Sequence, residues 1–262
     1  MRLCCVAVFT LLLIHCPLSA QQRTTAQQAP QRSVANPQDI RMLNAVLARW
    51  EQAMKNVATL QTTIRRTSID KVFNTKEIYK GYARYLKTKH ANLATLHLQN
   101  MKRKAIFEKY VITSDYLYQY DPTQKLIRVQ RLPKGRNGQL TDDNFLGFLF
   151  GMDAAEAKKR YDLRYIAPPE NDKWYYYIEI RAKRKEDKAD FTRARLVLLR
   201  STFMPRQLWF EEQNGNEVFW DFESIDTKAN LRVTDFAQPK LPAGWQFRRE
   251  PIPPQPRMSR GK

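Results

Sequence analysis

The residue types that most often carry out catalysis or bind metals are sparse in this chain. His90 and His97 have no acidic or histidine neighbour at metal-binding spacing, as in His-Glu-x-x-His. The pairs Asp142-Asp143 and Glu211-Glu212 are adjacent in sequence, and neighbouring residues of a strand point to opposite faces. They are not the converging carboxylates that acid–base catalysis needs. With no Gly-x-Ser-x-Gly elbow, P-loop or Gly-x-Gly-x-x-Gly motif either, we expect neither an enzyme nor a bound metal or cofactor.

The N-terminus has the three parts of a secretory signal. Arg2 supplies the positive charge, and residues 3–16 are apolar but too short for the roughly 20 residues of a membrane-spanning helix. Ala20 then offers a small residue at the cleavage bond. We expect residues 1–20 to be a cleaved signal peptide. Two alternatives stay open, a lipoprotein signal acylated at Cys16 and an uncleaved membrane anchor.

Cleavage has consequences for chemistry and charge. The three cysteines Cys4, Cys5 and Cys16 would be lost, and with them any disulfide, thiolate metal site or cysteine nucleophile. Loss of Arg2 from the 45 basic residues leaves 44 against 26 acidic ones, about +18. Such a charge favours anionic surroundings, namely phospholipid head groups or cell-wall polymers. An exported protein rarely meets nucleic acid, so we expect none as a partner, and a solvated basic face without a dedicated partner remains the alternative.

Aromatic residues are gathered in short runs at residues 174–177, 208–210 and 219–222. Because strand residues alternate between faces, each run places rings on both sides of a sheet. One interpretation is an ordinary sheet with helices on one face and a large core. The other is a curved sheet that encloses an apolar cavity lined by flat rings.

The elements that position these residues are a helix and two groups of strands. Asn36-Pro37 is a helix-start signal, and an amphipathic stripe follows at three- and four-residue steps, made of Ile40, Leu43, Leu47, Trp50, Met54 and Val57. From residue 59 the period changes to two. Roughly ten or eleven strands are expected, the last at residues 231–236, and an apolar and then helix-forming insert at residues 145–160 divides them.

Both ends of the chain have sequences typical of disorder. Residues 21–37 are rich in Gln, Thr and Ala without periodicity and form an expected leader. Residues 248–262 are rich in Pro and basic residues and form an expected tail. We expect this tail to contact anionic membrane surfaces through its basic residues, which are Arg248, Arg249, Arg257, Arg260 and Lys262.

The order of motifs resembles the LolA-like family, the bacterial periplasmic carriers of outer-membrane lipoproteins. The family hallmark is an aromatic-rich strand that ends in Tyr-Asn-Pro or Tyr-Asp-Pro, and here residues 110–122 end in Tyr120-Asp121-Pro122. The later family pattern has a proline before a strand, a turn around Gly and a closing Phe…Pro…Pro-x-Gly. It matches Pro205, Gly215 and residues 236–244. The likeness covers about residues 38–247 and is specific through the order and spacing of its motifs.

The resemblance implies an α+β, mainly β fold, an incomplete antiparallel β-barrel formed by a strongly curved sheet, with helices covering its mouth. It implies one periplasmic domain over residues 38–247 that carries lipid or lipoprotein acyl chains in an apolar cavity. Membrane-bound donor and acceptor proteins would be its partners. The lid and cavity candidates are Phe145, Phe148, Leu149, Met152, Tyr118, Tyr176, Ile178, Leu208 and Trp220.

One departure from the family bears on mechanism. The family carriers place an Arg-Pro pair after their second long strand, and that arginine takes part in lid closure. This chain has residues 87–90, Lys-Thr-Lys-His, in about that place. The departure points to a divergent branch, such as the LolA-like proteins of planctomycetes. The alternative function is a non-catalytic cell-envelope protein that holds anionic lipid or polymer through its basic surface.

Overall fold

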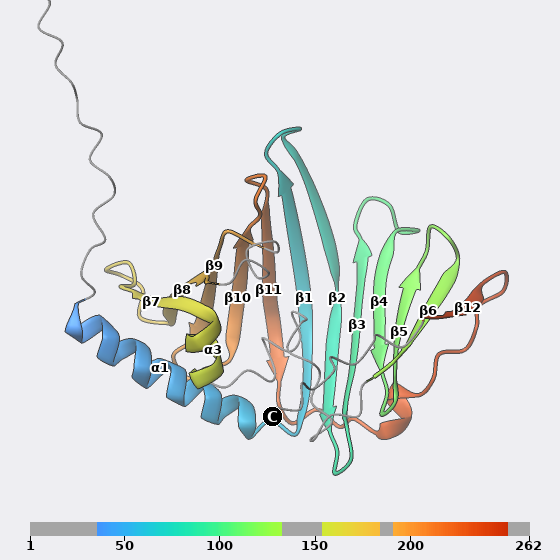
Figure 1. Ribbon diagram of the computed structural model, residues 1–262, viewed down its shortest axis with the longest axis horizontal. Helices are drawn as coiled ribbons and strands as arrows, with labels where there is room; N and C mark the ends of the chain where they lie inside the picture. Colours follow the sequence, from blue (N-terminus) through green and yellow to red (C-terminus); the bar gives the residue numbers. More distant parts are fainter. Residues whose placement is uncertain (1–35, 133–153, 184–190, 251–262) are drawn as a thin grey trace, which may run out of the picture. The chain divides into compact units, whose positions relative to one another are not determined.

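The computed structural model describes residues 36–132, 154–183 and 191–250 (Figure 1). The chain divides into two compact units, Met1–Val34 and Ala35–Lys262, and the described residues belong to the second. The expected signal peptide lies outside the described residues. So do the lid candidates Phe145, Phe148, Leu149 and Met152.

The predicted N-terminal helix is present as α1, Pro37–Lys55. The Asn36 side chain accepts a hydrogen bond from the Gln38 amide at 3.0 Å and satisfies one of the free donors at the helix start. The buried face comprises Leu43, Val46, Leu47 and Trp50. Ile40 is 46% exposed, so the apolar stripe begins one turn later than its sequence spacing predicts.

Twelve strands follow α1 and form one sheet. Their bounds are β1 Thr59–Asp70, β2 Thr75–Lys87, β3 Asn92–Asn100, β4 Phe107–Ile112, β5 Tyr116–Asp121, β6 Leu126–Arg131, β7 Tyr161–Ile166, β8 Tyr175–Ala182, β9 Arg193–Leu199, β10 Pro205–Glu211, β11 Glu217–Asp226 and β12 Gln246–Arg249. A short helix, α3 (Ala154–Arg160), precedes β7, and a 3-10 turn, η1 (Val233–Phe236), follows β11.

The sheet is open, as the sequence led us to expect for an incomplete barrel. Its strand order is β12-β6-β5-β4-β3-β2-β1-β11-β10-β9-β8-β7, so β12 and β7 are its two edges. Its neighbouring strands run antiparallel apart from β12 and β6, which are parallel. The expected fold class, a mainly β open sheet with helices, is confirmed.

The two described helices lie at the β7 end of the sheet. α1 packs against β7 and α3 (Figure 1), and the Glu51 side chain accepts a hydrogen bond from the first amide of α3, that of Ala154, at 3.1 Å. Eleven strand spacings of about 4.8 Å make the sheet roughly 53 Å wide, whereas 19 helical residues span about 28 Å. Thus α1 can cover at most about half of the width.

The faces of the sheet differ in what covers them. We call the face that packs on α1 and α3 the helix-side face, and the opposite one the outer face. The main core lies on the helix-side face and joins Leu47 and Trp50 of α1 to Ile64, Leu98 and Leu208 of the sheet. A smaller cluster at the β6 end contains Val111, Tyr118, Tyr120, Ile127 and Val129, with Phe107 and Trp245 packed against it.

The chain after β11 departs from the sequence prediction at two places. The strand expected at residues 231–236 is wrong, because Asp235 accepts a hydrogen bond from the Arg232 amide at 2.8 Å and closes the turn η1. The predicted start of the disordered tail, at residue 248, is too early, because β12 extends to Arg249. Arg248 and Arg249 lie in β12, because their backbone continues the ladder along the free edge of β6 and the prolines begin only at residue 251.

Among the described residues, no helix has both the length and the apolar character that crossing a membrane requires. This finding concerns residues 36–132, 154–183 and 191–250 alone.

Gly81 allows β2 and β3 to approach closely. A Cβ added there would lie 1.7 Å from the backbone oxygen of His97, and backbone cannot move aside as a flexible side chain can. We expect Gly81→Ala to lower the free energy of unfolding by about 2–3 kcal/mol. Urea denaturation measures the loss. Gly215→Asn is the control, since Gly215 has φ +81° in open space and Asn tolerates that conformation. Equal stability of Gly81→Ala and the parent would contradict the close approach.

Candidate functional site

Four of the five cavity candidates in the described part of the chain share the helix-side face. Ile178 and Leu208 both pair with Leu196 in the ladder, and Leu208 pairs with Trp220. Directly paired residues lie on the same face, so these side chains form one apolar row across β8, β9, β10 and β11. Their exposed fractions are 1% for Ile178, 0% for Leu208 and 9% for Trp220.

Tyr176 extends this face toward the end of the sheet. Its ring stacks on Phe203 with centroids 5.6 Å apart, and the guanidinium of Arg200 lies 4.9 Å from its centroid. Phe203 has φ +58°, which is uncommon for an aromatic residue. The stack packs against the main core, so Tyr176 adjoins the predicted cavity row.

Tyr118 does not join the other candidates. Its ladder partners are Val111 and Val129, and all three belong to the smaller cluster on the outer face. The alternation of β5 places Leu117 and Gln119 on the helix-side face instead. Tyr118 therefore lies on the opposite face from the other four described candidates, because its position in β5 is one residue out of phase with theirs.

A bidentate ion pair interrupts the apolar helix-side face. The guanidinium of Arg66 on β1 donates to the Glu108 carboxylate on β4 at 2.7 and 2.6 Å. In a flat sheet these strands are three spacings, about 14 Å, apart. The pair therefore spans two intervening strands and fits a sheet that curves toward its helix side.

Aromatic rings enclose this ion pair. The Arg66 guanidinium lies 4.4 Å from the centroid of Tyr79 and 5.4 Å from that of Trp220. Burial and the Glu108 carboxylate raise the pKa of the Tyr110 phenol, so Tyr110 stays neutral at physiological pH. The cluster is a polar patch within an apolar surface, next to the predicted cavity residue Trp220.

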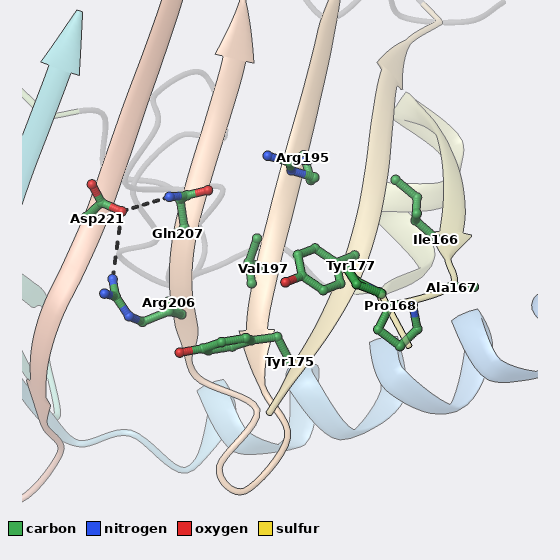
Figure 2. Close-up of a pocket in the computed structure, with 11 residues that line it drawn as sticks. Ile166, Ala167, Pro168, Tyr175, Tyr177, Arg195, Val197, Arg206, Gln207 and Asp221 are labelled. Carbon is green, nitrogen blue, oxygen red and sulfur yellow. Dashed lines mark hydrogen bonds and ion pairs between the residues drawn. The ribbon is translucent and has the colours of Figure 1, made fainter. Parts of the chain in front are cut away.

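The outer face carries a groove of about 600 Å³ over β7 to β11 (Figure 2). Ile166, Pro168 and Tyr177 lie on one side of it, while Gln207 and Asp221 lie on the other (Figure 2). The remaining lining residues are Ala167, Pro169, Tyr175, Arg195, Val197 and Arg206. The groove is thus amphipathic, with an apolar and aromatic wall opposite a polar one.

Hydrogen bonds fix the polar wall of the groove. The Asp221 carboxylate accepts from the Gln207 amide at 2.8 Å and lies 3.8 Å from the Arg206 guanidinium (Figure 2). Arg65 of β1 reaches the same carboxylate at 3.6 Å. The negative charge of Asp221 is therefore compensated.

The aromatic wall is fixed through Asp172. Its carboxylate accepts hydrogen bonds from the Tyr177 hydroxyl and from the Trp174 and Tyr175 amides. Burial, and then this hydrogen bond, raise the pKa of Tyr177 to about 12. Tyr177 is a neutral phenol at neutral pH, and its O–H is already used.

The His97 ring is packed among aromatic rings. His97 packs edge-on to Tyr82 and Phe107, with ring centroids 5.7 and 6.0 Å away. Burial and nearby Lys109 lower its pKa. The described ranges contain no group of three or more His, Cys, Asp or Glu side chains that could hold a metal.

Of the five basic residues expected to contact a membrane, the structure describes two. Arg248 and Arg249 are exposed residues of β12, and Arg248 lies 3.9 Å from Glu250. Arg257, Arg260 and Lys262 lie outside the described residues. Their contact with a membrane stays a prediction.

Sequence reasoning missed Arg66, Glu108 and Arg195. A signal for Arg66 was present, because Leu60, Thr62, Ile64 and Arg66 occupy one phase of the strand and a cation continues an otherwise buried series. Nothing in the sequence links Arg66 to Glu108, since their contact depends on the curvature of the sheet.

No family model matches the chain, and no curated protein matches it. Several solved structures have a similar arrangement. An uncharacterized conserved protein from Thermus thermophilus is 14% identical, covers 80% of this chain and 99% of its own, and gives a TM-score of 0.48. MucB is 13% identical over 77% of this chain, which spans 64% of MucB, with a TM-score of 0.47.

A LolA superfamily protein from Nitrosomonas europaea is also similar. It is 11% identical, covers 75% of this chain and 97% of its own length, and gives a TM-score of 0.34. It belongs to the family that the motifs of this chain resemble. All three TM-scores lie below 0.5.

Glu108→Gln tests the internal ion pair. The variant leaves the Arg66 charge on a largely buried surface without its carboxylate, and we expect a loss of about 3 kcal/mol in the free energy of unfolding. The Arg66 side chain is 15% exposed and that of Glu108 31% exposed. Glu77→Gln is the matched control, because its pair with Arg103 is exposed and should contribute less than about 1 kcal/mol. Equal losses in chemical denaturation would contradict a special role for the internal pair.

Proposed function

We propose that this protein is an exported, non-catalytic carrier that binds lipid or lipoprotein acyl chains on the helix-side face of its sheet. One observation carries the proposal: apolar side chains occupy this face from β8 to β4, on either side of the Arg66–Glu108 ion pair. Leu96 and Leu98 on β3 share a core with Ile178 and Leu208, and Ile112 on β4 is 2% exposed. From β8 to β4 this face is seven strand spacings wide, roughly 34 Å.

The hydrophobic effect is the driving force for acyl binding. Each methylene removed from water contributes about 0.8 kcal/mol, so a long chain gains enough to bind without polar anchors. A carrier must also release its cargo, which favours a movable cover over a closed cavity. Phe145, Phe148, Leu149 and Met152, which are spaced as one helical face, are the proposed cover.

The polar cluster of Arg66, Glu108 and Tyr110 would fix the orientation of a bound lipid on this surface. Acyl chains would lie along the apolar row, and Arg66, Glu108 and Tyr110 would face the polar end of the cargo. The periplasm is the proposed compartment, and membrane-bound donor and acceptor proteins are the proposed partners. Mass spectrometry of lipids that co-purify with the protein is the direct test of the cargo.

Neighbouring residues of β5 provide a matched test of which face binds lipid. Leu117 lies on the helix-side face and Tyr116 on the outer face, and neither is fully buried. We expect Leu117→Asp to weaken binding of a fluorescent fatty acid about tenfold or more, because a carboxylate resists burial beside an acyl chain. Tyr116→Asp should bind as the parent does. Equal effects of both variants, or none from Leu117→Asp, would contradict binding on this face.

The alternative is a cell-envelope protein that holds anionic lipid or polymer through its basic surface, and the high positive charge favours it. We expect the protein to sediment with anionic vesicles at low salt and to be released as ionic strength rises. Deletion of residues 251–262 removes Arg257, Arg260 and Lys262 but spares β12. It should weaken sedimentation by about 1 kcal/mol per engaged cation. Binding that is indifferent to salt, or equal on neutral vesicles, would show that the charge only solvates the surface.

A further inference from the structure

The groove on the outer face contains a cation that lacks a countercharge. Arg195 on β9 lines the groove floor beside Val197 (Figure 2). Across the described ranges it makes no ion pair, and its Nε is buried without a hydrogen-bond partner. Glu179 lies directly opposite on β8, but its carboxylate pairs with Arg181 at 3.3 Å instead.

The other arginines of this face differ from Arg195. Arg193, two residues earlier on the same strand, pairs with Glu211 at 3.1 Å. Both arginines lie against the Trp209 ring, Arg193 at 5.0 Å and Arg195 at 5.5 Å from its centroid. The ring therefore holds the Arg195 side chain in place, while its charge remains available to a ligand.

The lining of the groove indicates what that ligand is. Arg206 uses one nitrogen for Asp221 and the Phe222 carbonyl oxygen, and a guanidinium has further donors. The lining contains two arginines, Arg195 and Arg206, and one carboxylate, Asp221, so its net charge is positive. Ile166, Pro168 and Tyr177 offer an apolar wall (Figure 2), and about 600 Å³ is large enough for a small organic molecule.

We propose that this groove binds a phosphate ester. Arg195 contacts the phosphate oxygens, and the apolar wall of Ile166, Pro168 and Tyr177 packs on the organic part of the ester. A phosphate group has several acceptor oxygens and suits the donors of the Arg195 guanidinium. The site is on the face opposite the proposed acyl surface and does not depend on acyl binding. The ester is either a free small molecule or the head group of an anionic phospholipid.

The test is a titration of the purified protein with sn-glycerol 3-phosphate, followed by intrinsic tryptophan fluorescence and calorimetry. We expect saturable binding that Arg195→Gln weakens about 10- to 100-fold, because a charge-assisted contact is lost. Arg193→Gln removes the same charge from the same strand and ring but does not line the groove, so it should bind as the parent does. Equal weakening by the two variants, or no saturable binding, would overturn the proposal.

A second variant covers the case in which Arg195→Gln does not fold. Ala167 is an exposed residue of the groove rim, and Ala167→Glu places a carboxylate there that repels the phosphate. It should abolish binding while circular dichroism stays unchanged, and unaltered affinity would also overturn the site. Competition by phosphatidylglycerol vesicles, but not by neutral ones, would identify the lipid head group as the source. Binding of glycerol phosphate without such competition would identify a soluble ester.

Discussion

The apolar surface on the helix side of the sheet is wider than the helices that pack on it. A sheet of twelve strands is about twice as wide as α1 is long. Leu96 and Leu98 nevertheless belong to one core with Trp50 and Leu47, and Ile112 is 2% exposed. This broad apolar face, wider than α1 is long, is the feature on which the proposed acyl-binding role depends.

The curvature of the sheet turns this surface into a concave one. The contact between Arg66 and Glu108 across two intervening strands draws β1 and β4 together on that side. Breaking such a pair leaves a charge on a poorly solvated surface, so the pair favours the curved form. It also holds the Arg66 guanidinium 5.4 Å from the centroid of the Trp220 ring, where the polar end of a ligand would lie.

The outer face is used differently at its two ends. Near β6, Trp245 stacks on Phe107 at 6.0 Å and lies 5.7 Å from Tyr120, so the segment that leads to β12 covers a second apolar cluster. Near β8 and β9, the same face is a groove with Arg195 in its floor. Because residues of a strand alternate between faces, the outer face carries aromatic rings near β6 and Arg195 near β9. The proposed acyl-binding surface and the proposed anionic-ligand site therefore lie on opposite faces of the sheet.

The sequence by itself determined the local elements. The cap at Asn36, the apolar stripe of α1 and the two-residue period of the strands follow from backbone geometry and burial, which act over a few residues. Only the tertiary structure decided the features that depend on pairing between strands far apart in sequence. The outward position of Tyr118, the parallel addition of β12 and the contact of Arg66 with Glu108 are set by register and curvature across strands that are far apart in sequence. Periodicity within one strand carries no information about its partner, and for that reason these features emerged only with the folded sheet.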